Sequence, residues 1–317
     1  MADGSVVTWG SADYGGDSSG VQGQLINVQR LQATTRAFAA LLADGSVVTW
    51  GRRDCGGDSS AVQSQLRGVQ QVEATDFAFA AILADGSVVT WGNPDCGADS
   101  SAVQDQLGGS VQQIRGATYA FAAVLTDGSV AAWGDTDEGG SSAEVQDQLR
   151  SVQKLQATST AFAATLADGS VVTWGNPKFG GDSTAVQDQL RIVEQIEATA
   201  GAFAAIVADG SVVTWGSADY GGDSSEVQGQ LINVQRLQAT TDGAFAALLA
   251  DGSIVTWGSS DCGGDSSAVQ DKLIKVQQLW ATEAAFVAIL SDGSVVTWGD
   301  PSHGGDSSAV QDQLKQI

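Results

Sequence analysis

The stretch DGSVVTWG, Asp3 to Gly10, decides the fold because the chain repeats it seven more times. The further copies begin at Asp44, Asp85, Asp127, Asp168, Asp209, Asp251 and Asp292, at intervals of 41 or 42 residues. Only residues 127–134, which read DGSVAAWG, depart noticeably from the pattern. A fixed period of this length is typical of repeat proteins, in which each unit buries its apolar surface against its neighbours.

Each unit reads as short β-strands separated by turns. Residues 69–74 alternate apolar and polar side chains, as a half-buried strand does. Residues 79–83 form an alanine-rich apolar run that suits an inner strand, and Asp85-Gly86 predicts a tight hairpin. The β-branched run 87–91 predicts the next strand. Residues 102–107 fit a short outer strand or a helical turn, and we favour the strand.

Three or four antiparallel strands in about 40 residues describe the blade of a propeller. The chain has eight W-G strands but seven copies of the AFAA strand, so we predict an all-β, seven-bladed β-propeller of ~41-residue repeats. An eight-bladed ring would lack two inner strands, and an open array is a further alternative. We expect one repeat domain over 1–317, with a partial unit 1–27 and repeat units 28–68, 69–110, 111–151, 152–192, 193–233, 234–275 and 276–317. In an alternative division, the N-terminal strand closes the last blade and 292–317 is spare.

A tryptophan recurs at one position of every unit: Trp9, Trp50, Trp91, Trp133, Trp174, Trp215, Trp257 and Trp298. A large aromatic side chain repeated in this way predicts packing between blades rather than a cofactor site. Trp280 stands outside this series, at a position where other units carry glutamine.

The composition limits the partners. The formal charge of −23 disfavours nucleic acid and anionic membranes as binding partners. We therefore expect the partner to be another protein, with a basic protein as one option. No apolar run approaches the length of a membrane span, and no leader is visible at the N-terminus. The three cysteines suit free thiols rather than disulfides, so an intracellular soluble protein is favoured. No cofactor is expected.

Residues 69–97, VQQVEATDFAFAAILADGSVVTWGNPDCG, resemble the repeat of the regulator of chromosome condensation family. The shared motifs are D-G-x-V-x-x-W-G and the loop after it, where Tyr14 and Tyr220 stand at the family's tyrosine position. In unit length the chain is most similar to the bacterial β-lactamase-inhibitor propeller of that superfamily. The resemblance spans the whole chain and implies a propeller. The family's histidine, its long exchange-factor insertion and the photoreceptor motif G-W-R-H-T are absent, so nucleotide exchange and photoreception are not expected.

Variation between units gathers in two loops, one after Ala-Thr and one after Trp-Gly. Connections of this kind in an antiparallel blade emerge at the same end, so both loops should form one face, with the Asp-Gly hairpins at the other. Varied loops on a rigid scaffold are typical of a recognition surface, although drift at exposed loops gives the same pattern. The candidate partner-binding residues are Arg36, Arg52, Arg53, Cys55, Phe77, Cys96, Tyr119, Glu138, Phe179, Tyr220, Cys262 and His303.

No catalytic or metal-binding constellation stands out. The chain has a single histidine and no phosphate-binding glycine loop, so we expect no enzyme. The aspartates of the Gly-Gly-Asp loop, such as Asp17 and Asp58, are expected to cap their own turns rather than bind Ca²⁺. The predicted function is a protein-interaction scaffold. The alternatives are a structural array that self-associates through its end strands or spare half-unit, and a cation- or carbohydrate-binding propeller.

Overall fold

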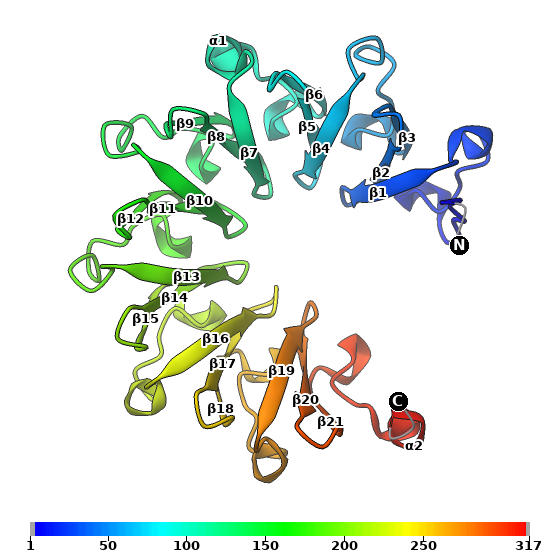
Figure 1. Ribbon diagram of the computed structural model, residues 1–317. Helices are drawn as coiled ribbons and strands as arrows, with labels where there is room; N and C mark the ends of the chain where they lie inside the picture. The colour runs from blue at the N-terminus through cyan, green and yellow to red at the C-terminus, as the bar shows by residue number, and fades with distance from the viewer. Residues whose placement is uncertain (1–3, 315–317) are drawn as a thin grey trace. The chain divides into compact units, whose positions relative to one another are not determined.

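The chain folds into seven antiparallel sheets of three strands each, which we call blades 1 to 7 (Figure 1). The computed structural model describes residues 4–314. These seven blades confirm the predicted all-β, seven-bladed β-propeller fold. The chain forms two compact units, one ending at Ala164 and one beginning at Thr165.

Each blade consists of three consecutive strands, in the order first, second and third. The strands are β1 Val28–Ala33, β2 Ala37–Leu42, β3 Val47–Gly51, β4 Val69–Ala74, β5 Ala78–Leu83, β6 Val88–Gly92, β7 Val111–Gly116, β8 Ala120–Leu125, β9 Val130–Gly134, β10 Val152–Ala157, β11 Ala161–Leu166, β12 Val171–Gly175, β13 Val193–Ala198, β14 Ala202–Val207, β15 Val212–Gly216, β16 Val234–Ala239, β17 Ala244–Leu249, β18 Ile254–Gly258, β19 Val276–Ala281, β20 Ala285–Leu290 and β21 Val295–Gly299.

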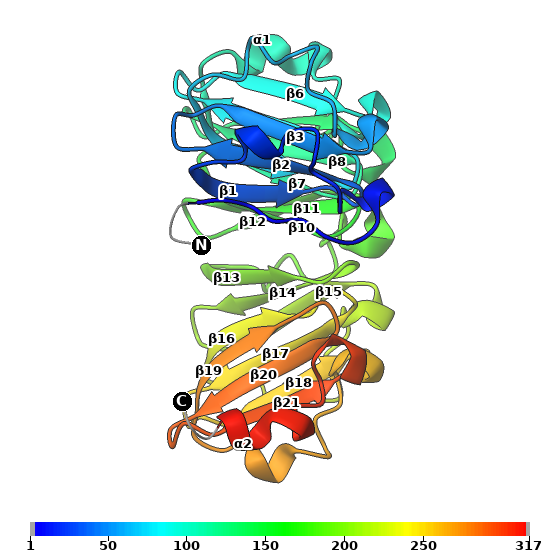
Figure 2. The ribbon, with the colours of Figure 1, turned by 90° about the vertical axis from the view of Figure 1, so that its right-hand side faces the viewer.

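Short helices occupy the loops that follow the third strands, and in the second unit α2 lies beside β21 (Figure 2). The 3₁₀-helices are η1 Ala12–Tyr14, η2 Gln22–Gln24, η3 Arg53–Cys55, η4 Pro94–Cys96, η5 Ser101–Val103, η6 Thr136–Glu138, η7 Pro177–Phe179, η8 Ala218–Tyr220, η9 Gln228–Gln230, η10 Ser260–Cys262, η11 Gln270–Lys272, η12 Pro301–His303 and η13 Ser308–Val310; the α-helical turns are α1 Gln104–Leu107 and α2 Gln311–Leu314. No described helix combines the length and apolarity needed to cross a lipid bilayer.

Small side chains allow neighbouring blades to pack closely. In the first unit, Ala37, Ala39 and Leu41 of β2 are buried against blade 2, where they meet Phe79 and Ala81 of β5. The same alternation recurs in the second unit between β17 and β20. Both faces of each inner strand are therefore buried, which explains why the sequence shows a nearly unbroken apolar run there.

Six of the repeated tryptophans tie their blades to the loop of the preceding repeat. Trp91 stacks on Phe79 with ring centroids 5.2 Å apart, and its indole N–H donates to the carbonyl of Gly56 at 3.0 Å. The same indole-to-glycine hydrogen bond is made by Trp50, Trp133, Trp215, Trp257 and Trp298. These contacts confirm the predicted role of these six tryptophans in packing between blades.

The Asp-Gly turn forms the predicted hairpin between second and third strands. Gly86 adopts a positive φ of 79° and donates its N–H to the carbonyl of Leu83. The Asp85 carboxylate accepts from the backbone N–H and the hydroxyl of Ser87. The carbonyl of Gly86 then accepts from Val111, the first residue of the next blade, so the hairpin also joins successive blades.

The outer segment at 102–107 is not the predicted edge strand, and this prediction is wrong. The structure has η5 followed by the helical turn α1 at that place. The Ser100 hydroxyl donates to the Gln104 side chain, whose amide donates to the carbonyl of Val88 in β6. Side chains therefore satisfy the outer edge of the third strand, and the helical turn buries Leu107 beneath it.

We predict that Trp91→Phe destabilises the protein by about 2 kcal/mol, because the buried carbonyl of Gly56 loses its donor and a cavity opens. The matched control is Trp9→Phe, since Trp9 is 84% exposed and should change stability by less than about 0.5 kcal/mol. Denaturant unfolding of both variants measures the difference. Equal effects of the two substitutions would contradict the packing role.

We predict that Ile192→Asn stabilises the protein by about 1 kcal/mol, because a β-branched residue is strained in the left-handed region and asparagine is not. Ile192 has φ 54° and is 62% exposed, and Asn233 occupies the equivalent position in the next blade with φ 56°. The reciprocal control, Asn233→Ile, should lower the melting temperature. If both substitutions shift stability in the same direction, backbone strain is not the cause.

Candidate functional site

The two variable loops of a blade meet at one end of the sheet, as predicted. In blade 2, the Thr75 hydroxyl donates to the carbonyl of Cys96 at 3.0 Å and accepts from the N–H of Ala78 at 2.9 Å. The same threonine-to-carbonyl bond links Thr34 to Cys55, Thr199 to Tyr220 and Thr282 to His303. In each unit, we call the surface formed by these paired loops the loop edge of that unit.

Backbone hydrogen bonds also join the loop edge from blade to blade. In the first unit, Thr35 donates to Asp76, Asp76 donates to Thr118 and Thr118 donates to Ser159, at 2.8–3.1 Å. In the second unit, Ala200 donates to Thr241 and Asp242 donates to Glu283. The loop edge of each unit is therefore a tied row of turns rather than a set of independent loops.

The aromatic candidates contact each other rather than standing free. Phe77 and Tyr119 of neighbouring blades stack with ring centroids 5.7 Å apart. In the second unit, Phe179 and Tyr220 meet edge to face at 6.1 Å, on either side of Gly201. All four rings are half-buried, so a partner can reach only their outer edges. The local sequence does not reveal these contacts, because each ring's neighbour lies about 41 residues away.

The cysteine candidates need a correction. Cys55 and Cys96 are buried beneath the loop edge, so their thiols are not accessible to a partner. Burial raises the pKa of both thiols, which keeps them protonated and unreactive. Cys262 is half-buried, and its Sγ lies 3.7 Å from the carbonyl of Asp242. The three cysteines are free, as predicted.

The basic candidates lie on the loop edge of the first unit. Arg36 is half-buried and lies over the ring of Tyr14 at 5.2 Å from its centroid. Arg52 and Arg53 are exposed and pair with Asp54 and Asp58 respectively. These arginines are therefore partly neutralised by aspartates of their own loop.

Exposed aspartates that the sequence pattern had not singled out recur in the 3₁₀-helices of the loop edge. They share the middle position of these helices, and they are Asp13, Asp54, Asp95 and Asp137 in the first unit and Asp219 and Asp261 in the second. Their recurrence at one repeat position is the signal that could have found them. They give the loop edge a recurring negative charge, in a chain whose formal net charge is −23.

Two further candidates carry titratable groups. His303 Nδ1 lies 3.0 Å from the Asp300 carboxylate, and this hydrogen bond raises the pKa of the imidazole. Burial, followed by the nearby charges of Asp135 and Asp137, raises the pKa of Glu138. Glu138 Oε2 is buried without a hydrogen-bond partner among residues 4–314. The Ser302 hydroxyl also lies 3.0 Å from His303 Nδ1, and the Glu283 carboxylate lies 3.6 Å from His303 Nε2.

The Gly-Gly-Asp loop behaves as predicted. The Asp17 carboxylate accepts from the backbone N–H of Ser19 at 2.9 Å, which lowers the pKa of Asp17. The equivalent bonds are made by Asp58, Asp99, Asp182, Asp223, Asp265 and Asp306. Within the described part of the chain, no three His, Cys, Asp or Glu side chains are grouped to hold a metal ion.

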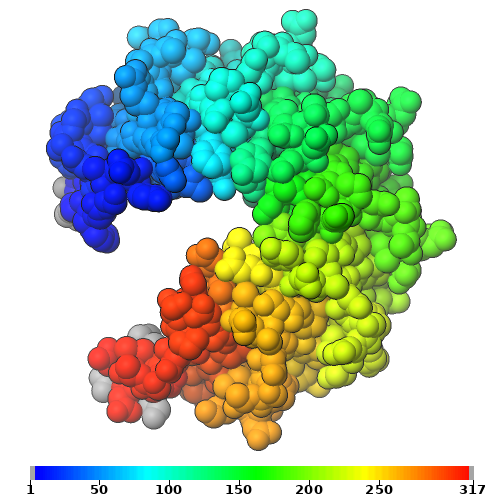
Figure 3. All heavy atoms as spheres, turned by 180° about the vertical axis from the view of Figure 1, so that it is seen from behind, coloured from blue at the N-terminus to red at the C-terminus, as the bar shows by residue number. Residues whose placement is uncertain are grey.

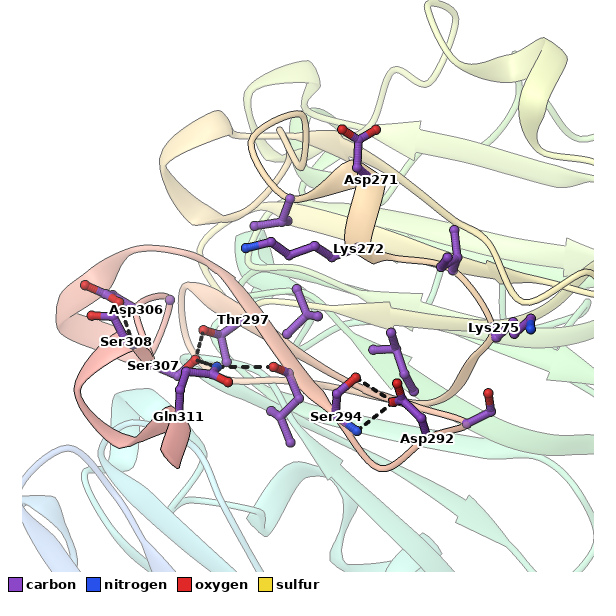
Figure 4. Close-up of a pocket in the computed structure, with 17 residues that line it drawn as sticks. Asp271, Lys272, Lys275, Asp292, Ser294, Thr297, Asp306, Ser307, Ser308 and Gln311 are labelled. Carbon is purple, nitrogen blue, oxygen red and sulfur yellow. Dashed lines mark hydrogen bonds between the residues drawn. The ribbon is translucent and has the colours of Figure 1, made fainter. Parts of the chain in front are cut away.

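A hollow of ≈ 820 Å³ lies on the outer side of the last blade (Figure 4). Part of its polar lining is paired: Ser294 donates to Asp292, and Gln311 contacts both Ser307 and the carbonyl of Val295. Hollows of ≈ 640 and ≈ 780 Å³ repeat at outer grooves elsewhere in the chain. The hollow is therefore part of the repeat architecture and not a distinctive ligand site.

The chain is similar in fold to several proteins of known structure. No protein-family model and no curated protein sequence matches the chain. The CRINKLY WD40 ectodomain of the Arabidopsis thaliana receptor kinase ACR4 is 17% identical, over 83% of this chain and 90% of that one, with a TM-score of 0.45. Yeast RCC1 (Prp20), solved bound to Kap60, is 17% identical over 86% and 70%, with a TM-score of 0.47. The ectodomain of the Physcomitrella patens receptor kinase CR4 is 15% identical over 83% and 70%, with a TM-score of 0.48. At this distance the similarity says nothing about what this chain binds.

Proposed function

We propose that this chain is a non-enzymatic scaffold that binds another protein through its loop edge. The observation that carries the proposal is the contrast between an invariant frame and varied side chains. The threonine and backbone hydrogen bonds fix the turns, while the residues displayed on them differ from unit to unit. A surface held in place before binding loses little conformational entropy when a partner docks.

The charge of the loop edge favours a partner with a basic docking surface. The exposed aspartates of the 3₁₀-helices repel acidic partners and attract lysine- and arginine-rich surfaces over about one Debye length. Arg52 and Arg53 add a local positive charge with which an acidic side chain of the partner can form an ion pair. The half-buried rings of Phe77 and Tyr119 supply the apolar edge between them.

The experiment compares two variants with the same charge change. The first removes four exposed groups of the loop edge: Arg52→Ala, Arg53→Ala, Asp54→Ala and Asp95→Ala. The control removes two arginines and two aspartates elsewhere: Arg150→Ala, Arg191→Ala, Asp147→Ala and Asp188→Ala, all at least 74% exposed. Both variants keep the net charge, and neither removes a buried side chain.

Proteins captured from the native source on the immobilised chain are compared for the parent and both variants. We predict that the partner, once purified, binds the loop-edge variant at least tenfold more weakly, a loss of about 1.4 kcal/mol, and binds the control variant unchanged. Its affinity should also fall as salt rises, because exposed charges contribute to the contact. A partner that distinguishes neither variant from the parent docks elsewhere and contradicts the proposal.

A further inference from the structure

The blade ends opposite the loop edge carry a second set of side chains that differ between repeats. At this end, each hairpin between second and third strands lies beside the connections that enter the first strands of its own blade and of the next. In the second unit, Ala250 donates its N–H to the carbonyl of Asn233 at 3.0 Å, and Val276 donates to the carbonyl of Gly252 at 2.9 Å. Hairpins and connections therefore alternate in one continuous row.

Two neighbouring blades of the second unit expose an isoleucine on this row. Ile232 and Ile274 precede the first strands of blades 6 and 7, and each is 58% exposed. The equivalent residues of the other blades are Ile26, Arg67, Gly108, Arg150 and Arg191. Isoleucine therefore occurs in successive blades only at 232 and 274. A single exposed isoleucine is common on a protein surface, but adjacent ones indicate a contact surface.

Hairpin alanines join the two isoleucines into one patch. The connection that carries Ile232 lies between the hairpins of blades 5 and 6, and the connection that carries Ile274 lies between those of blades 6 and 7. The first residues of the hairpins of blades 5 and 6 are exposed alanines. We define the hairpin patch as Ala208, Asp209, Ile232, Ala250, Asp251 and Ile274. Blades 5 to 7 pack against one another, from yellow-green to orange in Figure 3, so neighbours from its own unit hold the patch in place.

The hairpin patch also carries two carboxylates. The Asp251 carboxylate accepts from the hydroxyl and the N–H of Ser253, and Asp209 makes the same two bonds with Ser211. The hydroxyl bond, followed by the backbone bond, lowers the pKa of each aspartate, so both are charged at neutral pH. Both bonds use Oδ1, so Oδ2 of each carboxylate can accept from a cation of a partner.

The backbone of the row does not offer an edge for strand addition. The carbonyls of Asn233 and Gly252 accept from Ala250 and Val276, and the N–H of Gly252 donates to Leu249. A partner must therefore bind through side chains. Aliphatic residues fit against the isoleucines and alanines, and basic residues fit beside the aspartates.

We propose that the hairpin patch binds a basic amphipathic α-helix of another protein. Packed sheets lie about 10 Å apart, which is also the length of about two helical turns. A helix that crosses the hairpins can therefore place one apolar residue of each heptad against each blade, with its lysines or arginines beside Asp209 and Asp251. Its C-terminal end fits beside the exposed Lys275, because a helix C-terminus carries partial negative charge.

This surface goes beyond the proposed scaffold function. Within the second unit, the hairpin patch and the loop edge lie at opposite ends of the same blades. One chain can therefore hold two proteins at once, one at each end.

The test measures binding of a fluorescent peptide of three heptads, each LKKLAKA, by fluorescence anisotropy at physiological ionic strength. A peptide of the same composition in scrambled order, without an apolar face, controls for nonspecific attraction to a chain of charge −23. The parent protein should bind the heptad peptide saturably and at least tenfold more tightly than the scrambled peptide.

The double substitution Ile232→Ser and Ile274→Ser should weaken binding of the heptad peptide at least tenfold, because it removes the apolar contacts. The matched control is Ile26→Ser, since Ile26 occupies the same repeat position in the first unit and is also 58% exposed. This control should leave binding unchanged. All three side chains are more than half exposed, so both variants should keep the parent melting temperature.

Charge is tested by a second pair of variants. Asp209→Asn with Asp251→Asn should weaken binding at least threefold, while asparagine keeps the acceptor oxygen that each turn needs. Asp44→Asn with Asp85→Asn removes the same charge from hairpins of the first unit and should leave binding unchanged. The loop-edge variant should bind the peptide normally, so failure of this inference and failure of the proposed scaffold function are distinguishable.

Four outcomes would overturn the proposal. The first is equal binding of the heptad and scrambled peptides, or binding of neither, as a patch already covered by another part of the protein would give. The second is a double serine variant that binds no more weakly than Ile26→Ser. The third is binding of anionic lipid vesicles that the double serine variant abolishes, since the patch would then contact a lipid surface. The fourth is a concentration-dependent increase in mass by light scattering that the same variant abolishes, since a second copy of this chain would then occupy the patch.

Discussion

The packing of each tryptophan against the preceding loop is the constraint on which the repeat depends. The indole needs a carbonyl acceptor and a flat surface at once, and Gly56 provides both for Trp91 because it lacks a side chain. A Cβ on Gly56 would lie 2.5 Å from the ring of Phe79, and its φ of 92° already favours glycine. The tryptophan, the phenylalanine and the glycine therefore determine one another, and their spacing sets the period of the sequence.

The sequence predicted the elements governed by local chemistry. The Asp-Gly hairpin, the inner alanine-rich strand and the aspartate caps depend on residues close together in the chain, and all three are found where expected. The outer segment was predicted wrongly because the alternation in 102–107 suits a strand as well as a helical turn. The choice is made by Ser100 and Gln104, which bond to β6 across a loop and satisfy its edge without another strand.

Accessibility of the loop residues was the harder property to predict. Whether Cys96 or Phe77 faces solvent depends on the neighbouring blade, whose contacting residues are a full repeat away in sequence. The loop edge consequently has two layers. Buried thiols and half-buried rings pack between the turns and form the inner layer. Charged side chains form the outer layer and face solvent. A short 3₁₀-helix exposes this position in every repeat, and six of the eight helices carry aspartate there, while the other two carry Lys178 and Ser302.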